Sequence, residues 1–264
     1  MNWHRISALI LRYTFLYTRS MPRILEMFFW PIMELLVWGM LTQYLQTGPF
    51  KVPGFIKFLL GAMIFWDILY RAQQATTISF LEDIWARNLL NIFVAPVRVS
   101  EFIVATYCVG FVKILITVAG LSTMAAIFYH FNVLNMGFAL IPLFINLLVM
   151  GWAVGMVTTG MIMRWGQASE ALAWGIPFLI QPFCAAFYPL DSMPAWIRPI
   201  SLAIPATYVF EGMRAVLAGQ GLSLKYVLCA TGLNIVYLTA AALFFWFMYG
   251  KAREQGLLAK LGTQ

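Results

Sequence analysis

Charge is scarce in this sequence. Only 10% of its 264 residues are Asp, Glu, Lys or Arg, whereas 62% are hydrophobic, and the mean hydropathy is +0.82. A soluble domain is roughly 45–50% apolar and about 25% charged. A water-soluble fold of this composition would lack the polar side chains needed to cover its surface. We therefore expect an all-α integral membrane protein whose apolar helix faces contact lipid.

The sequence also lacks the patterns of several enzyme and metal-binding classes. Its three cysteines, Cys108, Cys184 and Cys229, lie in apolar stretches without the spacing of a disulfide framework or a zinc site. Neither G-x-S-x-G nor H-E-x-x-H occurs, and the phosphate-binding pattern G-x-x-x-x-G-K-[ST] is missing. We therefore expect no catalytic residue, no metal ligand and no cofactor bound by this chain. ATP hydrolysis would need a separate subunit.

Six apolar segments follow the stretch 1–22. Each is long enough to cross the hydrocarbon of a bilayer, which takes about 20 helical residues. They lie at 24–45, 55–80, 101–128, 138–163, 168–188 and 225–249. The sequence thus predicts a single transmembrane domain over 1–264 with six transmembrane helices.

The formal net charge of +7 arises from basic residues near the ends of these segments, a pattern of the positive-inside rule rather than of a nucleic-acid surface. If the six segments cross in turn, one side carries the basic residues of the N-terminal stretch, of the second and fourth connections and of the C-terminal tail. We expect that side to be cytoplasmic, with both termini on it. Arg12, Arg19 and Arg23 interrupt what would have to be the apolar core of a cleavable signal peptide, so we expect none.

The stretch 1–22 is too charged to cross a membrane. Arg5, Arg12 and Arg19 recur every seven residues and therefore share one helical face. Apolar side chains form an opposing stripe, made of Trp3, Ile6, Ile10, Tyr13 and Tyr17. This pattern predicts an amphipathic interfacial helix on the cytoplasmic leaflet. A helix packed on protein would show the same pattern.

Two connections are expected to contain structure of their own. The segment 81–98 predicts an internal helix of about four turns that ends before Pro96. The segment 187–221 is too apolar for a free loop, and its four internal prolines exclude a single straight helix. A re-entrant helical hairpin over 189–217, packed against other helices on the outer side, fits both facts.

Two of these stretches carry recognisable motifs. In NLLNIFVAPVRVSEFI (88–103), a pair of leucines is followed by Pro96 and Val97. In the stretch 187–217, a proline motif and P-x-W precede an aromatic residue and E-x-x-R. These residues are Pro189, Pro194, Trp196, Tyr208, Glu211 and Arg214. With the amphipathic N-terminus, the layout resembles the permease subunits of type-2 ABC exporters (ABC-2), which handle O-antigen, teichoic acid, capsule, lipo-oligosaccharide and some drugs.

The resemblance implies a homodimer with two ABC ATPase subunits, which would bind ATP and Mg²⁺, and a substrate path between the two copies of the chain. It implies a place in the bacterial inner membrane, with membrane lipid and no nucleic acid as a partner. The segment 82–95 is similar to the family's cytoplasmic coupling helix. Residues expected to contact the ATPase there are Glu82, Asp83, Trp85, Arg87, Leu89, Leu90 and Phe93. A surface helix without a partner would suit the same side chains.

Ionisable side chains inside the expected spans are costly and usually face protein or water. Asp67 and Arg71 stand one turn apart and can pair, and Lys113 lies in the third span. Such groups either hold helices together or line the transport path. Aromatic residues nearby either stack on the rings of a sugar or form interfacial belts. The path candidates are Glu34, Trp38, Phe65, Trp66, Asp67, Tyr70 and Arg71.

The family motif residues of 189–217 are candidates for an outer gate, and Glu211 with Arg214 would alternatively form a structural brace. Gly151 and Gly155 have G-x-x-x-G spacing, which favours close helix packing within one subunit.

Three other function classes are open to comparison. An ion-coupled secondary transporter would use Asp67 with Arg71, or Glu34, and internal inverted repeats would support it; we find no convincing repeat. A lipid or glycan transferase would cluster acidic or His residues at one membrane face, and no such cluster is evident. A structural scaffold would explain neither the coupling segment nor the hairpin.

Overall fold

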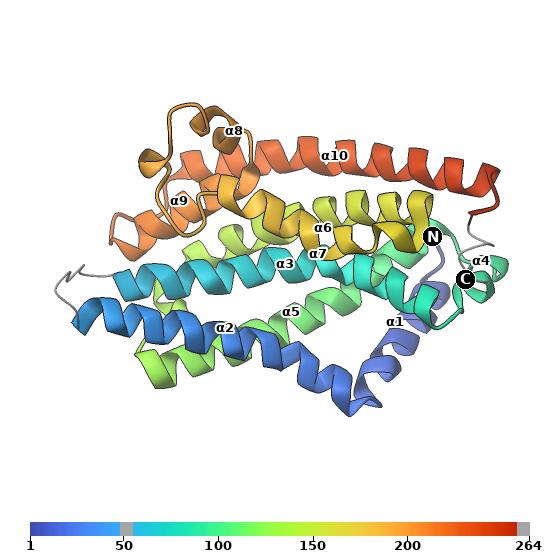
Figure 1. The fold of residues 1–264 in the computed structure, drawn as a ribbon, viewed down its shortest axis with the longest axis horizontal. Helices are drawn as coiled ribbons and strands as arrows, with labels where there is room; N and C mark the ends of the chain where they lie inside the picture. Colours follow the sequence, from blue (N-terminus) through green and yellow to red (C-terminus); the bar gives the residue numbers. More distant parts are fainter. Residues whose placement is uncertain (48–54, 258–264) are drawn as a thin grey trace.

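The computed structural model describes residues 1–47 and 55–257, which form α-helices and short 3-10 turns without any strand. Long helices make up the body of the molecule and run side by side along its longest axis (Figure 1). They are α2 (Met21–Thr47), α3 (Phe55–Trp85), α5 (Val99–Tyr129), α6 (Leu140–Trp165) and α10 (Leu224–Glu254). The all-α class is confirmed.

Shorter elements gather at the two ends of this bundle. At one end lie α1 (Trp3–Thr18), α4 (Leu89–Val94) and the last turns of α10 (Figure 1). At the other end lie α8 (Arg198–Leu202) and α9 (Pro205–Leu217), with 3-10 turns at Val133–Ala139 and Leu190–Ser192. Between α6 and α8 the chain forms 3-10 turns at Gly166–Ser169 and Gln181–Phe183 and the short helix α7 (Ala171–Ile180). We refer below to the α1 end and the α9 end.

Four stretches are long and apolar enough to cross a membrane. They are Met21–Leu45, Val99–Tyr129, Val133–Trp165 and Leu224–Glu254, which match the first, third, fourth and sixth predicted spans. The second predicted span lies within α3, whose 31 residues extend about 46 Å. Its apolar character is diluted by charged residues such as Asp67, Arg71 and Glu82.

The fifth predicted span, 168–188, is not one membrane-length helix. α7 has only 10 residues, and helical structure continues through a 3-10 turn only to Phe183. Pro182 is the second residue of this turn, and Ala185 has a positive φ of 52°, which an α-helix cannot contain. The segment Ala171–Phe183 is therefore an apolar half-helix, and six crossings stay a prediction.

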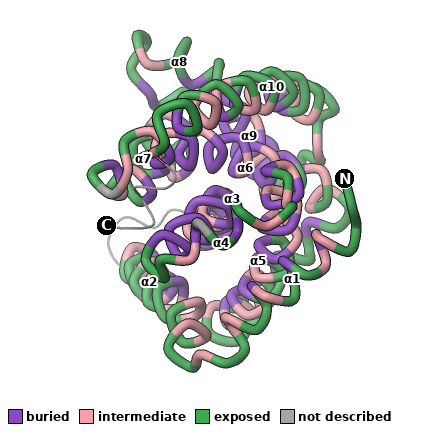
Figure 2. The backbone as a smooth tube through the Cα atoms, turned by 90° about the vertical axis from the view of Figure 1, so that its right-hand side faces the viewer, coloured by how far each residue is buried: buried purple, intermediate pink, exposed green. Residues whose placement is uncertain are grey.

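Helix α3 lies at the centre of the bundle. Its residues are buried along most of its length, and Figure 2 shows it surrounded by the other helices. It packs on α2, α5 and α6. At the α3–α6 contact, a Cβ added to Gly151 would lie 2.5 Å from the Leu69 carbonyl oxygen, and one added to Gly155 would lie 2.6 Å from that of Gln73. The G-x-x-x-G pair thus permits close packing within one subunit, as expected.

A buried polar seam crosses the α3–α6 contact at the same level. The Gln73 side-chain amide donates to the Thr158 hydroxyl at 3.4 Å and to the Ala173 carbonyl at 3.2 Å. The Thr77 hydroxyl donates to the Gly155 carbonyl at 3.3 Å. These hydrogen bonds join α3, α6 and α7 and fix the position of the three helices relative to one another.

The predicted hairpin over 189–217 is only partly helical. Its second arm is the regular helix α9, whereas its first arm consists of turns and the five-residue α8. Pro199 and Pro205 stand in the first turns of α8 and α9, where a missing N–H costs nothing. The expectation that the prolines exclude one straight helix is therefore correct. Entry of this segment into the membrane stays a prediction.

Candidate functional site

The α1 end contains a network of ion pairs around the C-terminal turn of α3. Asp83 is 1% exposed, and its carboxylate accepts a hydrogen bond from the Tyr13 hydroxyl at 2.5 Å and pairs with the Arg12 guanidinium. Glu82 accepts from the Tyr17 hydroxyl at 3.1 Å and lies 3.8 Å from Nε of Arg23. These two acids, expected to face an ATPase, therefore tie α3 to the N-terminal helix.

Helix α1 is held by apolar contacts as well as by these bonds. Ile6, Leu9 and Tyr13 are buried, and α1 packs along α5. Burial and the neighbouring Asp83 carboxylate raise the pKa of Tyr13, so its hydroxyl remains a neutral donor. The face of α1 with Ile6, Leu9 and Tyr13 is therefore packed on protein, which is the alternative considered for this helix from sequence. Trp3, Leu11 and Phe15 are exposed, which leaves an apolar strip for the membrane surface predicted from sequence.

A third carboxylate anchors the start of the chain, and sequence reasoning missed it. Glu101 is 1% exposed at the first turn of α5, and its oxygens accept from the Asn2 backbone N–H at 2.7 Å and from that of Arg98 at 2.9 Å. Arg5 lies 3.8 Å away. An acid three residues after a helix start is a recognisable N-terminal capping signal, although its bond to Asn2 is not encoded locally.

The continuous helix predicted for 81–98 is interrupted. α3 ends at Trp85, and Arg87 takes a left-handed conformation with φ of 52°. The Asn88 N–H bonds to the Asp83 carbonyl and the Arg87 N–H to that of Ile84, both at 2.9 Å. This is the Schellman pattern that closes a helix, and the chain turns before α4 begins at Leu89. The coupling segment is a helix end, a turn and one short helix.

The outer surface of this turn differs from the set predicted to contact an ATPase. Leu89 is 0% exposed within the apolar cluster at the α1 end, so it supports the turn from inside. The side chains of Leu90 and Phe93 lie outside the described part of the structure. We call the exposed residues between positions 85 and 94 the α3–α4 edge: Trp85, Ala86, Arg87, Asn91 and Val94. The Trp85 indole also donates to the Glu170 carboxylate at 3.3 Å, which links the edge to the start of α7.

The seven candidates for a transport path do not form one surface. Phe65 and Trp66 are buried in the core of the subunit, and Trp38 stacks on Phe187 with ring centroids 5.0 Å apart. Asp67 and Arg71 form the expected i,i+4 ion pair at 2.7 Å, and Arg71 also donates to the Met27 carbonyl at 2.9 Å.

Within one subunit, then, much of this set joins helices together. Glu34 is half-buried on α2. Tyr70 and Arg71 alone of the seven line a pocket of about 530 Å³ between α2, α3 and α5.

The motif residues at the α9 end form a brace. The Arg214 guanidinium pairs with Glu211 at 2.7 Å and donates to the Ala185 carbonyl at 2.7 Å. The Glu211 carboxylate also accepts a hydrogen bond from the Leu190 backbone N–H at 2.8 Å. The pair thus satisfies backbone groups freed where the chain bends after α7, which is the bracing role weighed from sequence.

Four further gate candidates lie around this brace. Pro189 leads into the Leu190–Ser192 turn, and the Tyr208 hydroxyl donates to the Leu202 carbonyl at 2.9 Å. Pro194 precedes Trp196, whose side chain is 72% exposed. Trp196 is therefore the gate candidate most available for contacts outside the subunit.

The sequence is similar to that of a longer protein. The chain is 29% identical over 176 residues to ABC transporter G family member 20 of Dictyostelium discoideum. That alignment covers 66% of this chain but only 24% of the relative, so this chain spans a small part of the longer protein.

A sequence model of the family described as ABC-2 type transporter matches residues 6–218. The match runs from α1 through the α3–α4 edge to the end of α9, whereas α10 lies beyond it. Since this is most of the chain, the protein belongs to the ABC-2 type transporter family and is an ABC transporter membrane component.

Proposed function

We propose that this chain is the permease subunit of an ATP-driven exporter and works as a homodimer with two separate ATPase subunits. Family membership supports the transport role. The lack of a G-x-x-x-x-G-K-[ST] pattern in the chain supports a partner that binds ATP and Mg²⁺. The substrate would be amphipathic, either a lipid-linked glycan or a hydrophobic drug. The location would be the bacterial inner membrane, with both termini cytoplasmic.

The observation that carries the proposal is the position of the α3–α4 edge. The edge is exposed, yet it is tied to other helices. The ties are made by Trp85, the last residue of α3, and by the two acids just before it, Glu82 and Asp83. Trp85 bonds to the start of α7, and Asp83 and Glu82 bond to α1. A partner that pushes this edge would therefore move α1, α3 and α7 together. Such a joint motion is what coupling between ATP closure and a membrane path requires.

At the α9 end, the segment 189–217 would act as a lid. Its brace fixes the segment to the end of α7 through Arg214 and Ala185. A movement of α7 that starts at Glu170 would therefore be felt at the lid. The exposed indole of Trp196 would contact either substrate or the second copy.

The test of the coupling edge uses one exposed apolar residue at each end. Val94 is 83% exposed in α4, and Phe138 is 91% exposed near the α9 end. Val94→Asp is expected to reduce co-purification of the ATPase at least about fivefold, because a single well-placed apolar contact at an interface centre can be worth more than about 1 kcal/mol. Phe138→Asp is the matched control and should retain the partner. Equal recovery of the ATPase with both variants would remove α4 from the interface.

A further inference from the structure

The pocket between α2, α3 and α5 has walls of mixed chemistry near the elbow where α1 meets α2. Its volume is about 530 Å³. Three cationic side chains line it, Arg23, Arg71 and Lys113, together with the carboxylates of Glu26 and Glu82. Aromatic rings complete the wall: Tyr17, Trp30, Tyr70, Trp85 and Trp174.

Two of the three cations are satisfied within the chain. Arg71 pairs with Asp67 at 2.7 Å, and Arg23 lies 3.8 Å from Glu82. Lys113 differs, because its ammonium nitrogen lies 3.7 Å from the ring centroid of Tyr17 and, among residues 1–47 and 55–257, forms no ion pair. Glu82 and Glu26 line the same pocket, but neither carboxylate lies within ion-pair distance of this partly buried ammonium group, so its hydrogens are available to a further anionic partner.

The arrangement of the carboxylates leaves room for such a charge. One Glu82 oxygen accepts from the Tyr17 hydroxyl, the other is buried without a hydrogen-bond partner among the described residues, and Glu26 is exposed. The Tyr17 ring presents its negative face to Lys113 from one side only. The remaining ammonium hydrogens can therefore donate to an anion that enters the pocket.

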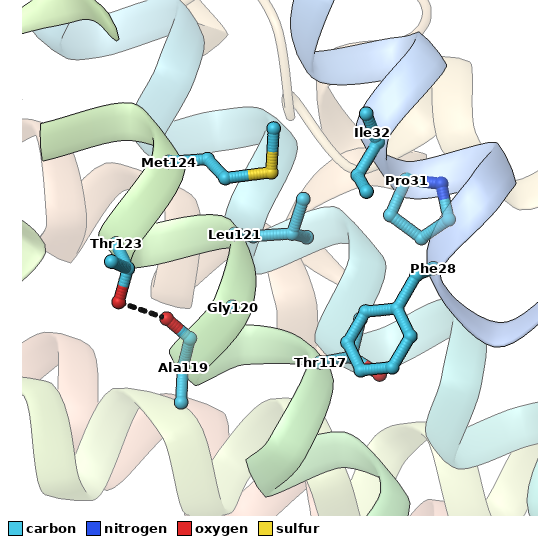
Figure 3. Close-up of a pocket in the computed structure, with 9 residues that line it drawn as sticks. All are labelled: Phe28, Pro31, Ile32, Thr117, Ala119, Gly120, Leu121, Thr123 and Met124. Atoms are coloured by element: carbon cyan, nitrogen blue, oxygen red, sulfur yellow. Dashed lines mark hydrogen bonds between the residues drawn. The ribbon is translucent and has the colours of Figure 1, made fainter. Parts of the chain in front are cut away.

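An apolar groove follows along the same two helices. α2 and α5 both run away from the α1 end, so residues 117–124 of α5 lie about 10 Å beyond Lys113 (Figure 1). The groove has a volume of about 340 Å³ between α2 and α5 (Figure 3). Its apolar walls include Phe28, Ile32, Leu121 and Met124.

The groove offers no free polar group from its two threonines. The Thr123 hydroxyl donates to the Ala119 carbonyl at 2.8 Å, as the dashed line in Figure 3 marks, and the Thr117 hydroxyl donates to that of Lys113 at 3.0 Å. A Cβ at Gly120 would lie 3.4 Å from the Phe28 ring, in ordinary van der Waals contact, so a large side chain at this position would fill the groove. The occupant that fits these walls is a hydrocarbon chain.

We propose that the pocket and the groove together bind one phosphate-headed membrane lipid. The phosphodiester would accept hydrogen bonds from Lys113, and one acyl chain would lie between α2 and α5. A lipid is favoured over a soluble anion because the charged and apolar parts follow one another along the same helix pair in a protein that spans a membrane. The site lies within one subunit, and it does not depend on the ATPase partner.

Native mass spectrometry of the purified full chain in detergent tests this site. The probes are phosphatidylglycerol, a diacylglycerol with the same chains, and inorganic phosphate. Phosphatidylglycerol should bind about tenfold more tightly than diacylglycerol, because one charge-assisted hydrogen bond is lost. Phosphate alone should not bind over the same concentration range. Phosphate binding as tight as that of the lipid would overturn the lipid assignment.

Two matched pairs of variants locate the two parts of the site. Lys113→Gln should lower phosphatidylglycerol affinity about tenfold and leave diacylglycerol affinity unchanged, whereas Lys225→Gln, at an exposed position of α10, should change neither. Gly120→Trp should weaken both lipids, whereas Gly232→Trp, where a Cβ meets open space, should weaken neither.

Retention of the charge provides a check against misfolding. Lys113→Arg should restore phosphatidylglycerol binding if the cation itself is what the lipid contacts. Wild-type affinity for phosphatidylglycerol in Lys113→Gln, or in Gly120→Trp, would overturn the proposal. Loss of binding in both Lys113→Gln and Lys113→Arg would likewise contradict it, because a charge-based site must tolerate the conserved charge.

Discussion

Replacement of Asp83 by Ala is expected to loosen α1 from the bundle. In the variant the Tyr13 hydroxyl, on a side chain that is 0% exposed, loses the acceptor that lies 2.5 Å away. An orphaned buried hydroxyl costs about 1–3 kcal/mol. Arg12 is 29% exposed and can turn to water, so loss of its ion pair adds only about 1 kcal/mol. The free energy that holds α1 in place should therefore fall by about 2–4 kcal/mol.

Amide hydrogen exchange measures this change directly. A loss of that size corresponds to about 30- to 1,000-fold faster exchange across residues 3–18, if exchange occurs through detachment of α1. Exchange in α6, which makes no bond to Asp83, should stay at its wild-type rate. Asp191→Ala, which removes an exposed carboxylate at the α9 end, is the control. Wild-type exchange of α1 in Asp83→Ala, or an equal increase in α6, would refute the reasoning.

Two further predictions concern the bundle and its outer brace. Gly155→Ala would place a Cβ 2.6 Å from the Gln73 carbonyl oxygen, so it should lower the free energy of unfolding by about 1–3 kcal/mol, whereas Gly232→Ala should not. A thermal shift assay in detergent compares the two variants. Equal melting midpoints would contradict the close α3–α6 packing. Arg214→Met frees the Ala185 carbonyl and should speed limited proteolysis within 185–190, with unchanged cleavage elsewhere. Wild-type cleavage there would show that the brace is dispensable.

The long helices could be predicted because their signal is local. Apolar runs of more than 20 residues without internal proline predicted both α5 and α10. Most ends of these two helices lie within a few residues of their predicted positions. The helical part of the predicted span 168–188 is shorter than expected, because the place where the helix ends depends on a distant residue. The bend at Ala185 is satisfied by Arg214, which lies 29 residues later. No local pattern shows where such a carbonyl finds its donor.

The candidate site was predicted in location more than in detail. Segment 82–95 does lie at one end of the bundle, but its two acids, predicted to contact an ATPase, bind α1. Asp83 and Tyr13 are 70 residues apart, and only the fold brings them together. The arginines spaced by seven residues on α1 were a partial signal, because a row of cations implies acids nearby. The sequence did not show whether Leu89 is buried within the subunit or exposed to a partner, since an apolar residue suits either a core or an interface.

Purification of the tagged wild-type chain from native membranes in mild detergent, with mass analysis of its partners, tests the central claim most directly. The account predicts stoichiometric recovery of a protein that carries a G-x-x-x-x-G-K-[ST] loop, and ATP-dependent substrate movement by that complex in vesicles. Recovery of the chain alone, in a form that moves substrate without ATP, would contradict the account.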